Sequence, residues 1–120
     1  MVKAYQRGKQ AEEQALNFLQ QYGLQPLEKN YRTARGEIDL IMLDDETIVF
    51  IEVRARSNDV YMKPLESIDH RKTQRIIYAS NHYLQRQKMS NDNSCRFDIV
   101  VLTGNNNRPK IEWIKNAFEA

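Results

Sequence analysis

Hydrophobic residues fall in short blocks along the chain, and the two clearest blocks lie close together within residues 37–55. EIDLIML is followed by a polar turn and then by TIVFIEVRA, and both blocks have the length and the apolar character of strands. Asp45 and Glu46 separate the blocks, so the pattern predicts a hairpin with a two-residue turn. Each strand also contains one acid, Asp39 or Glu52, which is unusual for strands fit for a core.

Apolar residues at helical spacing predict two helices. The first covers residues 4–22 and is followed by Gly23, which is a typical stop signal. The second covers residues 65–88, with Ile76, Ala79 and Tyr83 on its apolar side. The strands are expected at residues 24–32, 37–43, 47–55, 96–103 and 110–115, with loops at 57–64 and 89–94 and a turn at 104–109.

The expected order of elements is therefore α-β-β-β-α-β-β, in a single domain over residues 1–120. The strand at 47–55, the second helix and the strand at 96–103 form a β-α-β unit, which normally joins parallel strands by a right-handed crossover. We expect an α/β sandwich: a mixed sheet with helices on its faces.

Composition excludes several classes of protein. One cysteine, Cys95, excludes an intramolecular disulfide and a multi-cysteine zinc site. The N-terminus has no apolar segment typical of a signal peptide, and runs such as TIVFI are far too short to span a membrane. We therefore expect a cytoplasmic protein with no membrane association.

The net charge is only +2, but the basic residues are unevenly distributed. Eight of them lie in the middle of the chain, within residues 32–75: Arg32, Arg35, Arg54, Arg56, Lys63, Arg71, Lys72 and Arg75. Either a basic face for nucleic acid or an ordinary solvated charged surface is consistent with this distribution.

The hairpin predicts a pair of acids. With a two-residue turn, Asp39 lies directly opposite Glu52, with Cβ atoms roughly 5 Å apart. Like charges so placed need a shared proton, a basic side chain or a divalent cation, and oxygen ligands suit Mg²⁺ or Mn²⁺ better than zinc. Alternatively, Glu52 pairs with Arg54 or Arg56 at a sheet edge and Asp39 is solvated near Arg35.

Three further side chains are expected near the pair. Arg54 shares the strand face of Glu52. Glu12 lies at the border of the apolar face of the first helix and leans toward the sheet, whereas Glu13 lies on its wet face. Lys72 has a similar border position on the second helix, where a lysine can also simply extend to solvent.

Asp39 followed by Glu52-Val53-Arg54 resembles the motif of the PD-(D/E)xK nuclease superfamily. The chain more closely resembles one branch, the YraN-like bacterial proteins (uncharacterised protein family 0102), which is similar to archaeal Holliday-junction resolvases. The matching segments are GKQAEEQA (8–15), KNYRTARGEIDLI (29–41), VFIEVRAR (49–56), RKTQRI (71–76), RFDIV (96–100) and IKNAF (114–118).

This resemblance implies a restriction-endonuclease-like three-layer α/β/α sandwich and a Mg²⁺- or Mn²⁺-dependent phosphodiesterase site. Asp39, Glu52 and the Val53 carbonyl would bind the metal, and Glu12 would assist the metal or water. Arg54 and Lys72 would complete the catalytic set. The nucleic-acid contacts would be Arg32, Arg35, Arg54, Arg56 and Lys72. The implied substrate is nucleic acid, with branched DNA favoured, and analogy with enzymes that cut two strands implies a homodimer.

Arg54 departs from the superfamily pattern, which has lysine at this position. Arginine stays protonated and cannot act as a general base, although it can orient a phosphate with two hydrogen bonds. Two interpretations follow. Either Lys72 or the metal alone supplies the missing role, or the protein is a non-catalytic nucleic-acid-binding module that keeps the nuclease fold.

The remaining candidates are expected to be structural. His70 and His82 are predicted to be surface residues without partners. The aromatic residues Trp113, Tyr78 and Tyr83 are predicted to pack in the core or at its edge. Asp98, inside an apolar strand, is expected to bind backbone or a basic residue.

Overall fold

The computed structural model describes residues 4–57, 69–88, 94–104 and 108–120, with only the backbone of residues 4–7. The elements are α1 (Ala4–Gln21), β1 (Gln25–Arg32), β2 (Glu37–Asp44), β3 (Thr47–Arg56), α2 (His70–Arg86), β4 (Cys95–Thr103) and β5 (Lys110–Phe118). They form a five-stranded mixed sheet with two helices, which confirms the α/β class expected from the sequence. Neither helix, within these described residues, is long and apolar enough to cross a membrane.

The strands lie in the order β1-β2-β3-β4-β5. β3 and β4 are parallel, as expected for strands joined by a helical crossover, and all other neighbours are antiparallel. In the β2–β3 hairpin Asp44 pairs with Thr47 and Leu43 with Ile48. The predicted two-residue turn at Asp45 and its register are therefore confirmed.

Local capping explains where the helices end. Gly23 has a φ of +91°, a left-handed conformation that ends α1 where the sequence predicts. α2 begins at His70 because Asp69 is its N-cap, with Oδ1 accepting a hydrogen bond from the Lys72 N–H at 2.8 Å. The expected helix start at 65 and most of the expected loops at 57–64, 89–94 and 104–109 lie outside the described residues.

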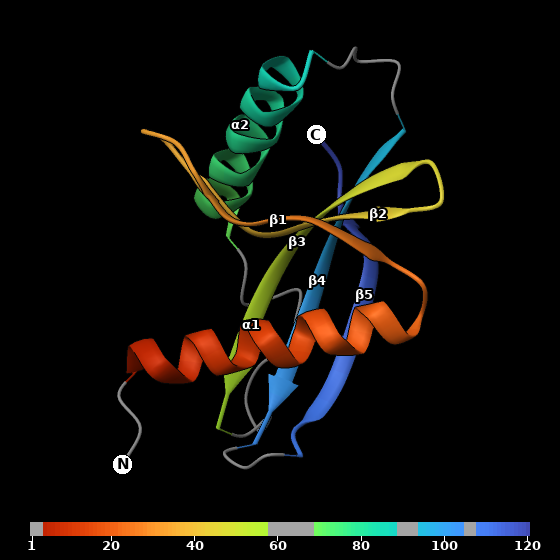
Figure 1. Ribbon diagram of the computed structural model, residues 1–120. Coiled ribbons are helices and arrows are strands. Elements are labelled where there is room, and N and C mark those ends of the chain that lie inside the picture. The colour runs from red at the N-terminus through yellow and green to blue at the C-terminus, as the bar shows by residue number, and fades with distance from the viewer. Residues whose placement is uncertain (1–3, 58–68, 89–93, 105–107) are drawn as a thin grey trace.

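Each face of the sheet packs against one helix. On one face α1 packs against apolar residues of the central strands, including Val49, Ile51 and Val100. On the other face α2 packs against Ile48 and Phe50, the alternate residues of the same strand β3. Figure 1 shows α1, in red and orange, crossing β3, β4 and β5, with α2, in green, beyond the β1–β2 hairpin. Residues of β3 therefore face two different cores.

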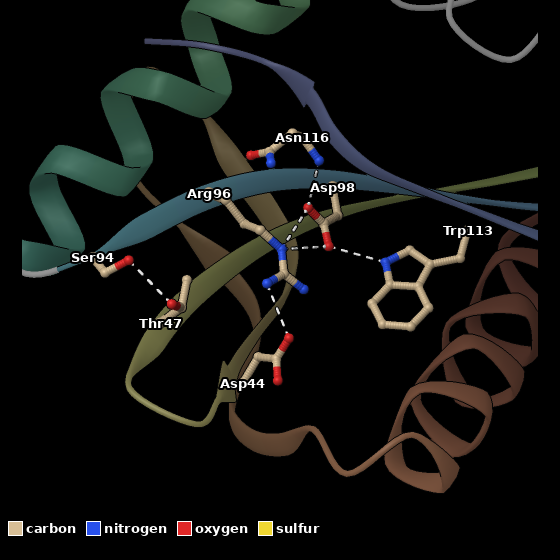
Figure 2. A network of polar contacts seen from close by, with 7 residues as sticks. All are labelled: Asp44, Thr47, Ser94, Arg96, Asp98, Trp113 and Asn116. Carbon is tan, nitrogen blue, oxygen red and sulfur yellow. Dashed lines mark hydrogen bonds and ion pairs between the residues drawn. The ribbon is translucent and has the colours of Figure 1, made fainter.

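A buried polar network joins β4 to β5 and to the end of β2 (Figure 2). The Asp98 side chain is 0% exposed and accepts hydrogen bonds from Arg96 Nε, Trp113 Nε1 at 2.9 Å and the Asn116 N–H at 3.1 Å. Arg96 also contacts Asp44 at 2.9 Å. Asp98 thus binds both backbone and a basic residue, as predicted. Strand β5 extends to Phe118, beyond the expected end at 115, and Asn116 in this added part of the strand contacts Asp98.

Both edge strands are irregular. The β1–β2 register shifts between Pro26 and Glu28, and Asn30 in β1 has a φ of +50°. The β4–β5 register shifts between Phe97 and Ile99, and Asn116 in β5 has a φ of +52°. The two central pairings of the sheet have no such shift within the described residues.

The loop between β1 and β2 touches the backbone of α2 at Gly36. A Cβ atom placed on Gly36 would lie under 3.0 Å from the carbonyl oxygen of Arg75, closer than real Cβ atoms approach. Only glycine allows the loop to lie this close to the helix. Gly36 thereby fixes the positions of Arg35 and Glu37 relative to α2.

Gly36→Ala is therefore expected to destabilise the protein by about 2 kcal/mol, because the added methyl group must push the loop from the helix. Urea unfolding at pH 7 measures the effect. Gly8→Ala is the matched control, since a Cβ on Gly8 in α1 meets open space and alanine favours a helix. Equal midpoints for the two variants would contradict this account of Gly36.

Candidate functional site

The two strand acids meet at the open end of the β2–β3 hairpin. The regular pairing of these strands reaches Leu40 and Ile51. One residue further, the Asp39 side chain binds β3, with Oδ2 accepting a hydrogen bond from the Val53 N–H at 2.8 Å. This contact holds the Asp39 carboxyl beside β3, next to Glu52.

Asp39 and Glu52 interact directly through their carboxyl groups. Burial, and then the negative charge of Glu52, raise the pKa of Asp39 to about 8, and a side-chain hydrogen bond to Glu52 acts in the same direction. The Val53 N–H opposes this rise because it stabilises the charged form. Asp39 is therefore largely protonated at pH 7. The shared proton is one of the three forms of neutralisation expected from the sequence.

Two basic side chains neutralise Glu52, which is 5% exposed. Lys72 Nζ lies 2.5 Å and Arg54 Nε 3.7 Å from the same oxygen, Oε2. Oε2 accepts no hydrogen bond of regular geometry, so both contacts act mainly through charge. The alternative prediction, a Glu52–Arg54 pair at a sheet edge, is correct for the pair but wrong for the edge, because β3 lies inside the sheet. Its second part is also wrong, since Asp39 contacts Glu52 instead of being solvated near Arg35.

A pocket of about 260 Å³ opens beside Glu52. Its lining residues come from β2, β3 and the first turns of α2: Glu37, Glu52, Asp69, Arg71, Lys72, Arg75 and Ile76. Arg71 and Arg75 were not among the site residues expected from the sequence. The available signal was the sequence of α2, which contains four Lys and Arg residues and no acid.

The first helix contributes one acid to this region. Glu12 is half-buried, and its charge helps to raise the pKa of Asp39. Glu13 is exposed and forms an ion pair with Lys29 at 2.7 Å. The different orientations predicted for these neighbouring glutamates are confirmed, and the structure brings Glu12, Asp39, Glu52 and the two cations near Glu52 into one region.

The other expected nucleic-acid contacts lie around this region. Arg32 forms an ion pair at 3.5 Å with Glu37, which lines the pocket. Arg35 instead lies over the ring of Tyr78, 5.6 Å from its centre. Arg56 is half-buried at the end of β3, two residues beyond Arg54. Lys63 lies outside the described residues.

The chemistry of the acid pair suits a hard divalent cation. Among the described residues, no group of three or more His, Cys, Asp or Glu side chains is arranged to hold a metal. Mg²⁺, however, is commonly bound by one or two carboxylates, together with waters and substrate phosphates. Asp39, Glu52 and the Val53 carbonyl would supply such an oxygen set, if the cation replaced the proton of Asp39.

Two side chains, Tyr78 and His82, differ from their predicted roles. Tyr78 was expected to pack in the core or at its edge, but it is 40% exposed, because it points away from the buried face of α2. Tyr83 is buried and Trp113 packs against the α1 core, as predicted. His82 is exposed but has a partner, since its Nδ1 lies 2.6 Å from the Tyr31 hydroxyl. The prediction that His82 has no partner is wrong.

Comparison with known proteins places this architecture in a family. Residues 11–102 match the model of Uncharacterised protein family UPF0102. A UPF0102 protein of Pseudomonas fluorescens is 44% identical over 96% of this chain and 94% of its own length. One from Pseudomonas putida is 46% identical over 93% of this chain and 92% of its own. A UPF0102 protein of Pseudomonas aeruginosa is 44% identical over 95% of this chain and 93% of its own length. The chain therefore belongs to protein family UPF0102.

Proposed function

We propose that the protein hydrolyses phosphodiester bonds in nucleic acid, with DNA as the favoured substrate and Mg²⁺ or Mn²⁺ as the cofactor. The observation on which this rests is the pair formed by half-buried Asp39 and buried Glu52, beside a pocket lined by Arg71, Lys72 and Arg75. Removing paired acids from water costs stability, and titratable groups perturbed in this way are concentrated at functional sites. Cations beside them suit a phosphate group.

Each side chain has a distinct role in this proposal. Asp39 and Glu52 would hold the metal, and Glu12 would orient water or the metal from the α1 side. When bound, the metal would lower the pKa of a water and stabilise charge on the phosphate. Lys72, half-exposed in the pocket, would bind the phosphate if Glu52 held the metal in place of this lysine.

Arg54 is assigned to orienting the phosphate. Its guanidinium lies 3.7 Å from Glu52, stays protonated, and cannot accept a proton from water. The structure thus offers no general base at the position where PD-(D/E)xK nucleases have lysine. Activation of water would fall to the metal, with Glu12 as a positioning residue.

The resemblance to PD-(D/E)xK nucleases supports this proposal and extends it. It supports a restriction-endonuclease-like three-layer sandwich, and a cytoplasmic enzyme acting on branched DNA, as archaeal Holliday-junction resolvases do. Cutting two strands at a junction would require two copies of the site, hence a symmetric homodimer.

A second candidate is a non-catalytic nucleic-acid-binding module. The specific observation in its favour is the contact between Lys72 and Glu52, which puts an ammonium group where a metal would bind. If that ion pair persists in the presence of Mg²⁺, the basic pocket can still bind phosphate, but no hydrolysis will follow. This module would bind nucleic acid with a steep dependence on salt.

Cleavage of labelled single-strand, duplex, flap and four-way-junction DNA in Mg²⁺ and in Mn²⁺ distinguishes the two candidates. We expect wild-type protein to cleave at least one substrate, and Asp39→Asn and Glu52→Gln to lose at least about a hundredfold in rate. Asp45→Asn is the matched control, because Asp45 is an exposed acid at the tip of the same hairpin.

The control should cleave as wild type does. No cleavage of any substrate, together with salt-dependent binding that all four proteins share, would overturn the enzymatic proposal and support the binding module. Equal losses in all three variants would indicate a general effect of removing negative charge instead of a specific site.

A further inference from the structure

One exposed stripe of α2 continues from the pocket along the helix. Exposed side chains at positions i, i+4, i+7, i+11 and i+14 lie on one side of a helix. In α2 these positions are Arg71, Arg75, Tyr78, His82 and Gln85, and we call them the α2 stripe. At the helical rise of 1.5 Å per residue the stripe is about 21 Å long.

The α2 stripe is positively charged where it joins the pocket. Arg71 and Arg75 belong to both the stripe and the pocket wall. α2 contains no acidic residue, and Arg86 adds a charge at its far end. The acids that line the pocket are Asp69, which caps the helix, Glu37, which pairs with Arg32, and Glu52, which pairs with Lys72. This charge distribution complements a chain of phosphates.

The middle of the α2 stripe has the chemistry of a nucleobase site. Tyr78 is 40% exposed, and the Arg35 guanidinium lies over its ring. A second pocket, of about 230 Å³, is lined by Tyr78, Asn81, His82 and Gln85. Aromatic rings and guanidinium planes stack on bases, and amide side chains bond to base edges. The hydrogen bond between the Tyr31 hydroxyl and His82 Nδ1 fixes the His82 ring at the edge of this pocket.

We propose that the α2 stripe binds an unpaired stretch of nucleic-acid strand next to the bond to be cut. Arg71 and Arg75 hold its phosphates, and Tyr78 stacks on a base whose edge faces Asn81 and Gln85. This inference rests on the proposed function for the position of the cut, but the binding itself does not depend on catalysis. It makes a strand with unpaired bases the preferred ligand over an intact duplex, whose bases cannot reach Tyr78.

Fluorescence polarisation with a labelled single strand and a blunt duplex, in EDTA to prevent cleavage, tests the proposal. Tyr78→Ala is expected to weaken binding of the single strand about tenfold and to leave the duplex unchanged, whereas Tyr78→Phe keeps the wild-type affinity. Tyr22→Ala is the matched control, because Tyr22 is 62% exposed and lies at the end of α1, on the other face of the sheet.

Charge variants give a second, independent measurement. Gln85→Glu adds a negative charge to the α2 stripe and should weaken binding, whereas Gln20→Glu adds the same charge to an exposed position of α1 and should not. Arg75→Gln should lower the slope of log affinity against log salt by about 0.7, the value for one phosphate contact with a single strand.

Equal affinities of Tyr78→Ala and wild type for the single strand, or equal losses in Tyr22→Ala, would overturn the inference. If the wild-type protein cleaves no substrate and Tyr78→Ala loses binding of the single strand, the binding role of the α2 stripe would be supported and the nuclease proposal overturned. Cleavage by wild-type protein that Tyr78→Ala retains, with unchanged binding, would support the nuclease and overturn the stripe.

Discussion

Asp39→Asn will unfold at a higher urea concentration than the wild-type protein at pH 8, although it loses the proposed cleavage. Burial and Glu52 raise the pKa of Asp39 from 3.8 to about 8, so the folded protein disfavours the charged form that the unfolded chain adopts. Asparagine resembles the protonated acid: its oxygen can accept from the Val53 N–H and its amide can donate to Glu52.

The direction of the pH dependence follows from proton binding. Between pH 3.8 and about 8 the folded state retains a proton on Asp39 that the unfolded state has released. The contribution of Asp39 to stability is therefore complete below pH 3.8, falls as the pH rises, and is constant above about pH 8. One pKa unit corresponds to about 1.4 kcal/mol, so a rise of about four units sets an upper limit of about 6 kcal/mol on the gain of the Asp39→Asn variant at pH 8. We expect about half of this limit, because the surroundings of Asp39 relax when its carboxyl is charged.

Urea unfolding of both proteins from pH 4 to 9 measures this difference. The two midpoints should converge near pH 4 and separate as the pH rises, and Asp45→Asn should follow wild type throughout. A constant difference across this range would show that the Asp39 carboxyl is not the source. Added Mg²⁺ at pH 8 should stabilise wild type and not Asp39→Asn, because binding to the folded state alone raises its stability.

Asp98→Ala will come close to unfolding the protein at room temperature. Asp98 is fully buried and binds Arg96, Trp113 and the Asn116 backbone. Removing the Asp98 carboxylate leaves the mostly buried guanidinium of Arg96 with only Asp44 as an ion-pair partner. The loss of one partner from a buried ion pair costs about 3–5 kcal/mol. Small domains are stable by only about 5–15 kcal/mol in total.

Thermal unfolding followed by circular dichroism tests this expectation. Asp44→Ala removes the more exposed partner of Arg96 and should cost no more than about 1 kcal/mol. Trp113→Phe keeps most of the ring and loses one hydrogen bond, at a cost of about 1–2 kcal/mol. An Asp98→Ala protein as stable as Asp44→Ala would show that the network in Figure 2 contributes little to the fold.

The hairpin and its acid pair could be predicted because both depend on residues close in sequence. A two-residue turn fixes the register, and the register places Asp39 next to Glu52. The parallel pairing of β3 and β4 followed from the length and helical pattern of the segment between them.

The basic pocket could not be predicted in the same way. Helical periodicity shows which side of α2 is apolar, but it does not show which turn of the helix reaches Glu52. That position depends on the cap at Asp69 and on the close contact between Gly36 and Arg75. Arg71 and Arg75 therefore appeared only as basic residues, and Tyr78 was assigned to packing with the other aromatic residues, although it is exposed in the structure.

The irregular edge strands limit how copies of the protein can associate. An exposed, regular edge strand is a template on which a second sheet can add, and this is a common route to aggregation. In β1 and β5 the shifted registers and the left-handed Asn30 and Asn116 interrupt that template, while Lys29 and Lys115 add charge along it. Continuous pairing of two sheets across these edges is therefore disfavoured. A symmetric dimer would have to form through side chains of the helices or loops. The chemistry of these side chains, and not backbone hydrogen bonding between strands, would then determine which partner binds.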